Sequence, residues 1–111
     1  MTEPASHDVH VVVGDDSDRS RYEAHIGDRL AGVLSYADDA DGNRVLQHTV
    51  VGDAFGGHGV GSALARFAMQ DATDAGRMIV PQCTFVQGWL GKHPEHQSLV
   101  AHPYVPSPPT A

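Results

Sequence analysis

The stretch Phe55-Gly56-Gly57-His58-Gly59-Val60-Gly61-Ser62-Ala63-Leu64 joins two segments whose hydrophobic patterns differ. Residues 44–51, just before it, indicate a β-strand, and apolar residues recur at helical spacing after it. A glycine loop between a strand and a helix presents backbone N–H groups to a phosphate. The quoted stretch carries four glycines within six residues, which is more than a tight turn without a ligand requires. The stretch therefore favours an anionic cofactor over a purely structural turn.

The length of 111 residues indicates one domain with a modest core that needs no metal or disulfide. Hydrophobic residues make up 41% of the chain, which argues against disorder. No apolar run approaches the roughly 20 residues of a membrane helix, and residues 1–10 lack the pattern of a signal peptide. Because Cys83 is the single cysteine, no intrachain disulfide forms, and we expect a reducing, cytoplasmic location.

The net charge of -7 is carried by the first 53 residues, which hold 11 acidic and 4 basic side chains. No basic stripe is present, so binding to nucleic acid is not expected. The glycine loop lies in the neutral half, where an anionic ligand is least repelled, and the acidic half could attract a cationic amine. We interpret most of the clustered aspartates as solvated turn residues: Asp15, Asp16, Asp18, Asp38, Asp39 and Asp41.

The pattern before the glycine loop predicts four strands joined by short turns, hence an antiparallel meander, over residues 9–13, 21–26, 30–37 and 44–51. After the loop it predicts a helix, a short strand, a second helix and a further turn, over residues 60–75, 78–80, 85–92 and 95–100. The strand, helix, strand order predicts a parallel crossover. Asp71 falls in the apolar stripe of the first helix, either as the partner of a buried donor or where the stripe is uncovered.

Several of these segments together resemble a known family. The glycine loop is similar to the R/Q-x-x-G-x-G/A motif of the GNAT superfamily of acetyl-CoA-dependent N-acetyltransferases, with Gly56 in the first position. Three further segments are similar to a very small GNAT-like family: His48-Thr49, the Pro-x-Cys run in residues 80–86, and His93-Pro94-Glu95. The resemblance covers residues 9–100, nearly the whole expected folded region.

The resemblance implies a truncated GNAT-like α/β fold, with a mainly antiparallel mixed sheet, a glycine-loop helix and a short C-terminal helix. We expect one such domain over residues 1–102 and a disordered, proline-rich tail over residues 103–111. The implied co-substrate is acetyl-CoA, the implied acceptor is a small-molecule or protein amine, and no metal is implied. Two histidines beside Pro94, with no second cysteine, make weak evidence for zinc.

The resemblance also implies which residues bind the co-substrate. It assigns the pyrophosphate to the backbone N–H groups of the glycine loop, at Gly57, His58, Gly59, Val60, Gly61 and Ser62. It assigns the thioester carbonyl to a backbone N–H at the end of the preceding strand, from Thr49, Val50 or Val51, which would act as an oxyanion hole.

The candidate catalytic residues are Cys83 and His48. Cys83 could protonate the leaving thiolate, or form an acetyl-enzyme with His93 or His48 assisting, or be a small buried apolar residue. His48 is either a general base or a structural histidine on a sheet face. The chain departs from the family pattern at three positions, Val50 for glutamate, Thr84 for proline and His96 for tyrosine. The first change removes a candidate carboxylate base and the last a candidate phenolic acid, although a histidine could also carry a proton.

Two other functions stay open at this point. The chain could be a non-catalytic module that binds CoA or acyl-CoA, having lost its base at Val50, or a small structural domain with no ligand. The chain is also too short for the helices that usually shape an acceptor pocket. We therefore expect an open acceptor site or one that a second subunit of a homodimer completes.

Overall fold

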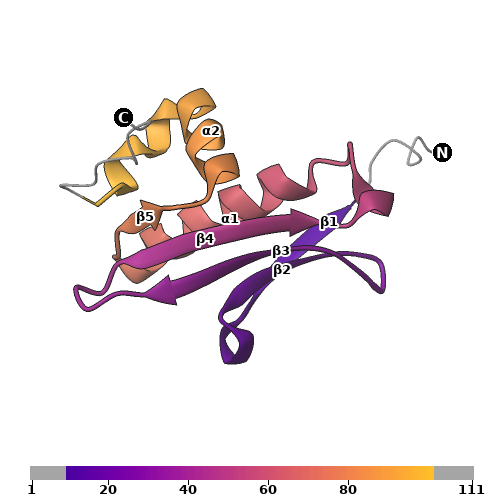
Figure 1. The fold of residues 1–111 in the computed structure, drawn as a ribbon, viewed down its shortest axis with the longest axis horizontal. Coiled ribbons are helices and arrows are strands. Elements are labelled where there is room, and N and C mark those ends of the chain that lie inside the picture. Colours follow the sequence, from indigo (N-terminus) through magenta and orange to yellow (C-terminus); the bar gives the residue numbers. More distant parts are fainter. Residues whose placement is uncertain (1–9, 102–111) are drawn as a thin grey trace, which may run out of the picture.

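A computed structural model describes residues 10–101 and shows one five-stranded sheet with its helices (Figure 1). The strands follow the order β1-β2-β3-β4-β5, with bounds Val11–Asp16, Arg21–Ile26, Arg29–Asp38, Arg44–Val51 and Ile79–Pro81. The helices α1 and α2 span Val60–Ala75 and Thr84–Lys92, and short 3₁₀ segments span Ser17–Arg19, Asp53–Phe55 and Pro94–Leu99. β1 to β4 pair antiparallel, and β4 pairs parallel with β5. The predicted α/β fold with a mixed, mainly antiparallel sheet is confirmed, whereas the predicted tail lies outside the described residues.

The first strand differs from its prediction. It continues through Gly14, Asp15 and Asp16, a run typical of turns, which pairs with residues 21–23 of β2. The carboxylate of Asp15 also accepts a hydrogen bond from Tyr36 at 2.6 Å. Cross-strand pairing therefore overrides the local turn preference, and the strand ends three residues later than predicted, at Asp16.

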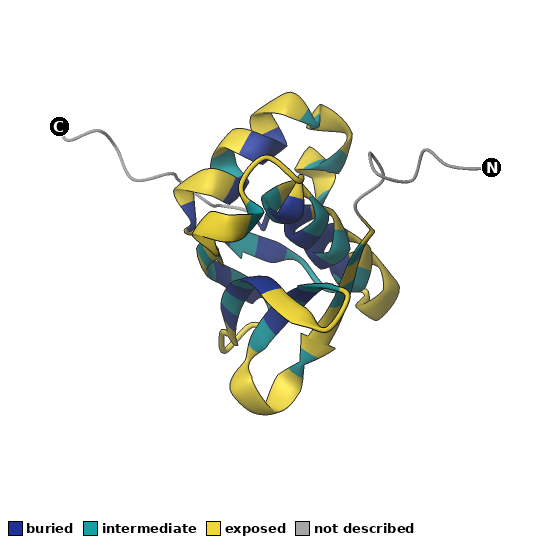
Figure 2. Ribbon diagram, turned by 90° about the vertical axis from the view of Figure 1, so that its right-hand side faces the viewer, coloured by how far each residue is buried: buried dark blue, intermediate teal, exposed yellow. Residues whose placement is uncertain are grey.

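Helix α1 packs its apolar stripe onto the sheet (Figure 2), burying Val60, Leu64, Ala65, Ala68, Met69 and Ala72. Gly32 on β3 allows the close approach, because a Cβ there would lie 2.8 Å from Cγ1 of Val60. The helix ends at Gly76, whose φ of 67° is left-handed and suits glycine. No helix within residues 10–101 has the length and apolar character needed to cross a bilayer.

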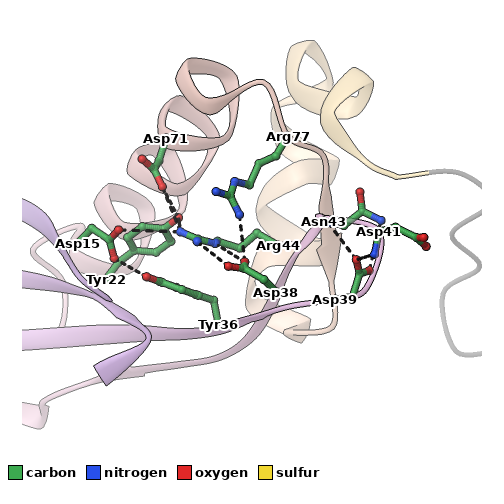
Figure 3. Close-up of polar contacts among 10 residues, drawn as sticks. All are labelled: Asp15, Tyr22, Tyr36, Asp38, Asp39, Asp41, Asn43, Arg44, Asp71 and Arg77. Carbon is green, nitrogen blue, oxygen red and sulfur yellow. Dashed lines mark hydrogen bonds and ion pairs between the residues drawn. The ribbon is translucent and has the colours of Figure 1, made fainter. Parts of the chain in front are cut away.

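A buried arginine holds the far end of α1 to the sheet (Figure 3). Arg44 is only 8% exposed, and its guanidinium donates two hydrogen bonds to Asp38, at 2.8 and 3.0 Å. It also donates to Tyr22 at 3.1 Å and to Asp71 at 3.3 Å. Asp71 therefore partners buried donors, which decides between its two interpretations. Asp15 and Asp38 are exposed, as expected, but they are not turn residues, because they lie in β1 and β3 and pair with Tyr36 and Arg44.

The burial of Tyr36 beside Arg44 leads us to expect that the protein loses stability at alkaline pH. Burial, followed by the hydrogen bond to Asp15, raises the pKa of Tyr36 to about 12. The unfolded chain ionises near the ordinary pKa of about 10. The stabilisation from neutral Tyr36 is therefore fully present below about pH 10 and is lost as the pH rises through about 12. Urea unfolding across this range should show a smaller alkaline loss for Tyr36→Phe than for wild type; equal losses would contradict this assignment.

Candidate functional site

The glycine loop is an exposed turn whose backbone N–H groups are free. Gly57 and Gly59 have φ angles of 80° and 74°, in the left-handed region where a side chain adds strain. No side chain caps α1 at Gly59. Within residues 10–101, none of the six N–H groups from Gly57 to Ser62 has a hydrogen-bond acceptor, because the first helical bond runs from Ala63 to the carbonyl of Gly59. These donors and the helix dipole suit an anion.

The third motif glycine has a different role. Gly61 has no left-handed φ, but a Cβ there would lie 2.8 Å from Cζ of Phe85. It is therefore a packing glycine that lets the start of α1 approach α2. The other predicted loop residues divide by exposure: the side chain of Val60 is buried, so only its N–H is available, whereas His58 and Ser62 are exposed.

The sheet is open between β4 and β5. β5 pairs with β4 only at residues 44–46, and the N–H groups of Gln82 and Cys83 then both donate to the carbonyl of Leu46 at 3.0 Å. The chain next enters α2, so no described strand pairs with this edge of β4 at residues 47–51. This edge leads directly towards the glycine loop.

A β-bulge decides which backbone groups face the opening. Ser35 pairs with His48 and Tyr36 with Leu46, which leaves Gln47 as an extra residue on β4. Just after the end of β4, the N–H of Gly52 donates a hydrogen bond to the carbonyl of Ala31 on β3.

Backbone groups alternate sides along a strand. Since Gly52 bonds towards β3, Val50 faces β3 as well, and the N–H groups of Thr49 and Val51 face the opening. Of the three predicted carbonyl-binding residues, Thr49 and Val51 are placed to donate there and Val50 is not. The side chain of Val50 is 60% exposed.

Cys83 lies at this opening. Its thiol is 3.2 Å from the hydroxyl of Thr49, with which it shares a hydrogen bond, and the residue is 6% exposed. His48 pairs with Ser35, on the sheet face opposite the buried Leu34, and is exposed. The structure therefore does not bring Cys83 and His48 together.

Nor does His93 reach the thiol. Its Nδ1 lies 2.8 Å from the carbonyl oxygen of Trp89, and its ring stacks on that indole with centroids 4.0 Å apart. No histidine among residues 10–101 hydrogen-bonds to Cys83. The same residues contain no group of three or more His, Cys, Asp or Glu side chains able to hold a metal ion.

Two of the three cations that form no ion pair within residues 10–101 lie beside the glycine loop. Four of the seven Arg and Lys side chains form ion pairs with carboxylates, namely Arg19, Arg21, Arg44 and Arg77. In the described part of the chain, the other three have no carboxylate within ion-pair distance: Arg29, Arg66 and Lys92.

Two of these three cations lie beside the loop, on different elements. Arg29 lies over the ring of Phe55, just before the loop, at 4.8 Å. Arg66 lies further along α1, and its guanidinium is 5.4 Å from the centroid of the Trp89 ring. Lys92 lines a cavity that also contacts Ser62. In a chain with a net charge of -7 this grouping favours an anionic ligand. The sequence motifs did not identify these three cations. The neutral charge balance of residues 54–111 was a signal for Arg66 and Lys92 only.

The comparisons with known proteins agree with this geometry. A family model described as GCN5-related N-acetyl-transferase matches residues 21–99, from the start of β2 through the 3₁₀ segment after α2. No curated protein shows significant similarity to the chain. The family match spans more than half of the chain and contains both the glycine loop and the β4–β5 opening. The chain belongs to the GCN5-related N-acetyltransferase family.

Proposed function

We propose that the protein is an acetyl-CoA-dependent N-acetyltransferase for a small-molecule or protein amine, working as one domain. One observation carries the proposal: the open edge of β4 leads directly into the glycine loop. The carbonyl-binding N–H groups of Thr49 and Val51 and the six free N–H groups of Gly57 to Ser62 therefore flank one path. The pantetheine arm of acetyl-CoA carries the thioester at one end and the pyrophosphate at the other, so it would lie along this edge with an acceptor for each set of donors.

The residues at the opening suit direct transfer to the amine. The neutral amine attacks the thioester carbonyl carbon, a C–N bond forms, and the C–S bond breaks. The N–H groups of Thr49 and Val51 stabilise the negative charge that develops on the carbonyl oxygen. The amine loses its proton to water, the leaving thiolate takes a proton from the Cys83 thiol, and the Cys83 thiolate then takes a proton from water. We prefer this route to an acetyl-enzyme because, within residues 10–101, no imidazole activates Cys83.

Calorimetry with acetyl-CoA, followed by measurement of free CoA released with a panel of amines, tests the proposal. We expect saturable binding, and CoA release that depends on both the protein and an amine. Binding with no release for any amine would favour the non-catalytic module, for which Val50 in place of glutamate is the supporting observation. No heat and no thermal shift with acetyl-CoA would favour a structural domain.

The role of Cys83 gives a separate prediction. Cys83→Ala should lower kcat by about a hundredfold, the lower end of what a general acid typically contributes, while KM changes little. Cys83→Ser keeps the hydrogen bond to Thr49 and controls for packing. Mass spectrometry of the enzyme with acetyl-CoA alone should show no acetylated protein. An acetyl group on Cys83 would show that Cys83 is a nucleophile and not a general acid. An unchanged kcat in Cys83→Ala would exclude both the general-acid and the nucleophile role.

A further inference from the structure

Within residues 10–101, one face of the sheet has no helix packed on it. Helices α1 and α2 pack on the face that carries Leu34 and Leu46 (Figure 2). Side chains alternate between the two faces along each strand, so the register of the strands identifies those on the other, uncovered face. They form three rows across the sheet, Val12–His25–Leu30, Gly14–Glu23–Val33–Val50 and Asp16–Arg21–Ser35–His48.

The uncovered face carries a patch of exposed apolar side chains. Three of the four large hydrophobic residues that are exposed within the described chain lie on it: Val12 at 56%, Leu30 at 44% and Val50 at 60%. They come from three different strands, and the partly exposed Val33, which pairs with Val50, lies among them. Exposed apolar side chains that gather in one patch, rather than scatter singly, mark an interaction surface.

The charges on this face are balanced. Its two carboxylates each form an ion pair at 2.8 Å, Asp16 with Arg19 and Glu23 with Arg21. The net charge of -7 is therefore carried by other parts of the chain. Two copies of this acidic protein repel each other least when they approach across the uncovered face.

Neither end of the chain suits this face. Residues 1–9 contain Met1 and Val9 as their only large apolar side chains. The described chain ends at Ala101, which bonds to β5 at the opposite end of β4 from Val50. A second copy, in contrast, brings the same apolar patch and the same balanced charge. We propose that the uncovered faces of two copies pack against each other in a two-fold symmetric dimer, as the sheets of a sandwich do.

The size of the face predicts a weak dimer. Four strands of about six residues, spaced about 4.8 Å apart with a rise of about 3.3 Å per residue, cover about 400 Å² in each copy. Two such faces bury less than the roughly 1,600 Å² of a standard interface, so we expect a dissociation constant no tighter than about micromolar. His48 and Val50 lie along the open edge of β4, so the second copy borders the opening. The inference does not depend on the proposed function.

Sedimentation equilibrium of the full chain, without acetyl-CoA, tests the dimer. Between about 5 and about 500 μM, wild type should pass reversibly from monomer to dimer. Leu30→Glu should weaken the dimer at least about tenfold, because two-fold symmetry places two unpaired carboxylates in the interface. Val12→Glu, on another strand, should do the same. Gln70→Glu adds the same charge on α1, on the other side of the sheet, and should dimerise like wild type.

Thermal unfolding of each variant shows whether the fold is kept, and a variant that has lost it is set aside for the other. Wild type that stays monomeric over the whole range would overturn the inference. So would a dimer unaffected by Leu30→Glu and Val12→Glu, which would use another surface. Equal weakening by Gln70→Glu would attribute the effect to net charge and not to this face.

Methyl NMR of wild type gives a second readout that needs no substitution. The methyl signals of Val12, Leu30, Val33 and Val50 should shift as the protein concentration rises through the dimer transition. Those of Leu99, which packs against the core on the helical side, should stay fixed. A dimer that shifts Leu99 and leaves the four residues of the patch unchanged would contradict the proposal.

Discussion

Replacing Ser62 by glutamate should weaken acetyl-CoA binding by about a hundredfold, while the fold stays at least as stable. Ser62 is exposed at the third position of α1, and its N–H is one of the six free donors. A carboxylate about 5 Å from one phosphate charge costs about 3 kcal/mol at an effective dielectric constant of about 20, which is about a hundredfold in affinity. The same carboxylate interacts favourably with the helix N-terminus, so the thermal midpoint should hold or rise.

This opposite effect on binding and stability separates a ligand site from a merely structural loop. Ser62→Gln is the matched neutral variant and should retain most of the affinity. Gln70→Glu adds the same charge at an exposed position of the same helix, away from the loop, and should bind like wild type. Calorimetry measures affinity and thermal unfolding measures stability. If Ser62→Glu binds acetyl-CoA as wild type does, the pyrophosphate does not lie on this loop.

The loop is also where sequence and structure agree best, because its conformation is local. The bounds of β2, β4 and α1 follow from hydrophobic period and from Gly76, and the structure reproduces them. The pairing between strands could not be predicted from the sequence. Nothing in the sequence marks Gln47 as a bulge, since a bulge exists only relative to the partner strand, yet it decides which N–H groups face the opening.

The site residues show the same division. The motif located Cys83 and Thr49, but only the fold brings these residues, 34 positions apart, to hydrogen-bonding distance. His48 follows the motif equally well, and strand pairing places it on the uncovered face instead. The unpaired state of Lys92 was likewise hidden, because it depends on where every carboxylate lies in space. Local chemistry was predictable, whereas side-chain partnership across the sheet was not.

Arg44→Ala should lower the free energy of unfolding by about 3 kcal/mol, the lower end of the range for breaking a buried ion pair. Arg44 is 8% exposed and joins β4 to Tyr22, Asp38 and Asp71. The substitution leaves two carboxylates and a phenol without their shared donor. Asp38 and Asp71 are 44% and 31% exposed, so water solvates part of what is lost, which is why we expect the lower end.

The acid dependence of this loss identifies its cause. The hydrogen bonds from Arg44 hold the pKa of Asp38 below its usual range. A carboxyl whose folded pKa is depressed contributes stability above its ordinary pKa of about 3.9, and that stability disappears as the pH falls through the folded value. Urea unfolding followed by Trp89 emission should therefore show a shallower acid limb for Arg44→Ala than for wild type. Arg19→Ala, which removes an exposed pair with Asp16, should leave neutral-pH stability almost unchanged. An Arg44→Ala variant as stable as Arg19→Ala would show that Arg44 is not needed to hold α1 to the sheet, where the Tyr22 hydroxyl also donates a hydrogen bond to Asp71 at 2.7 Å.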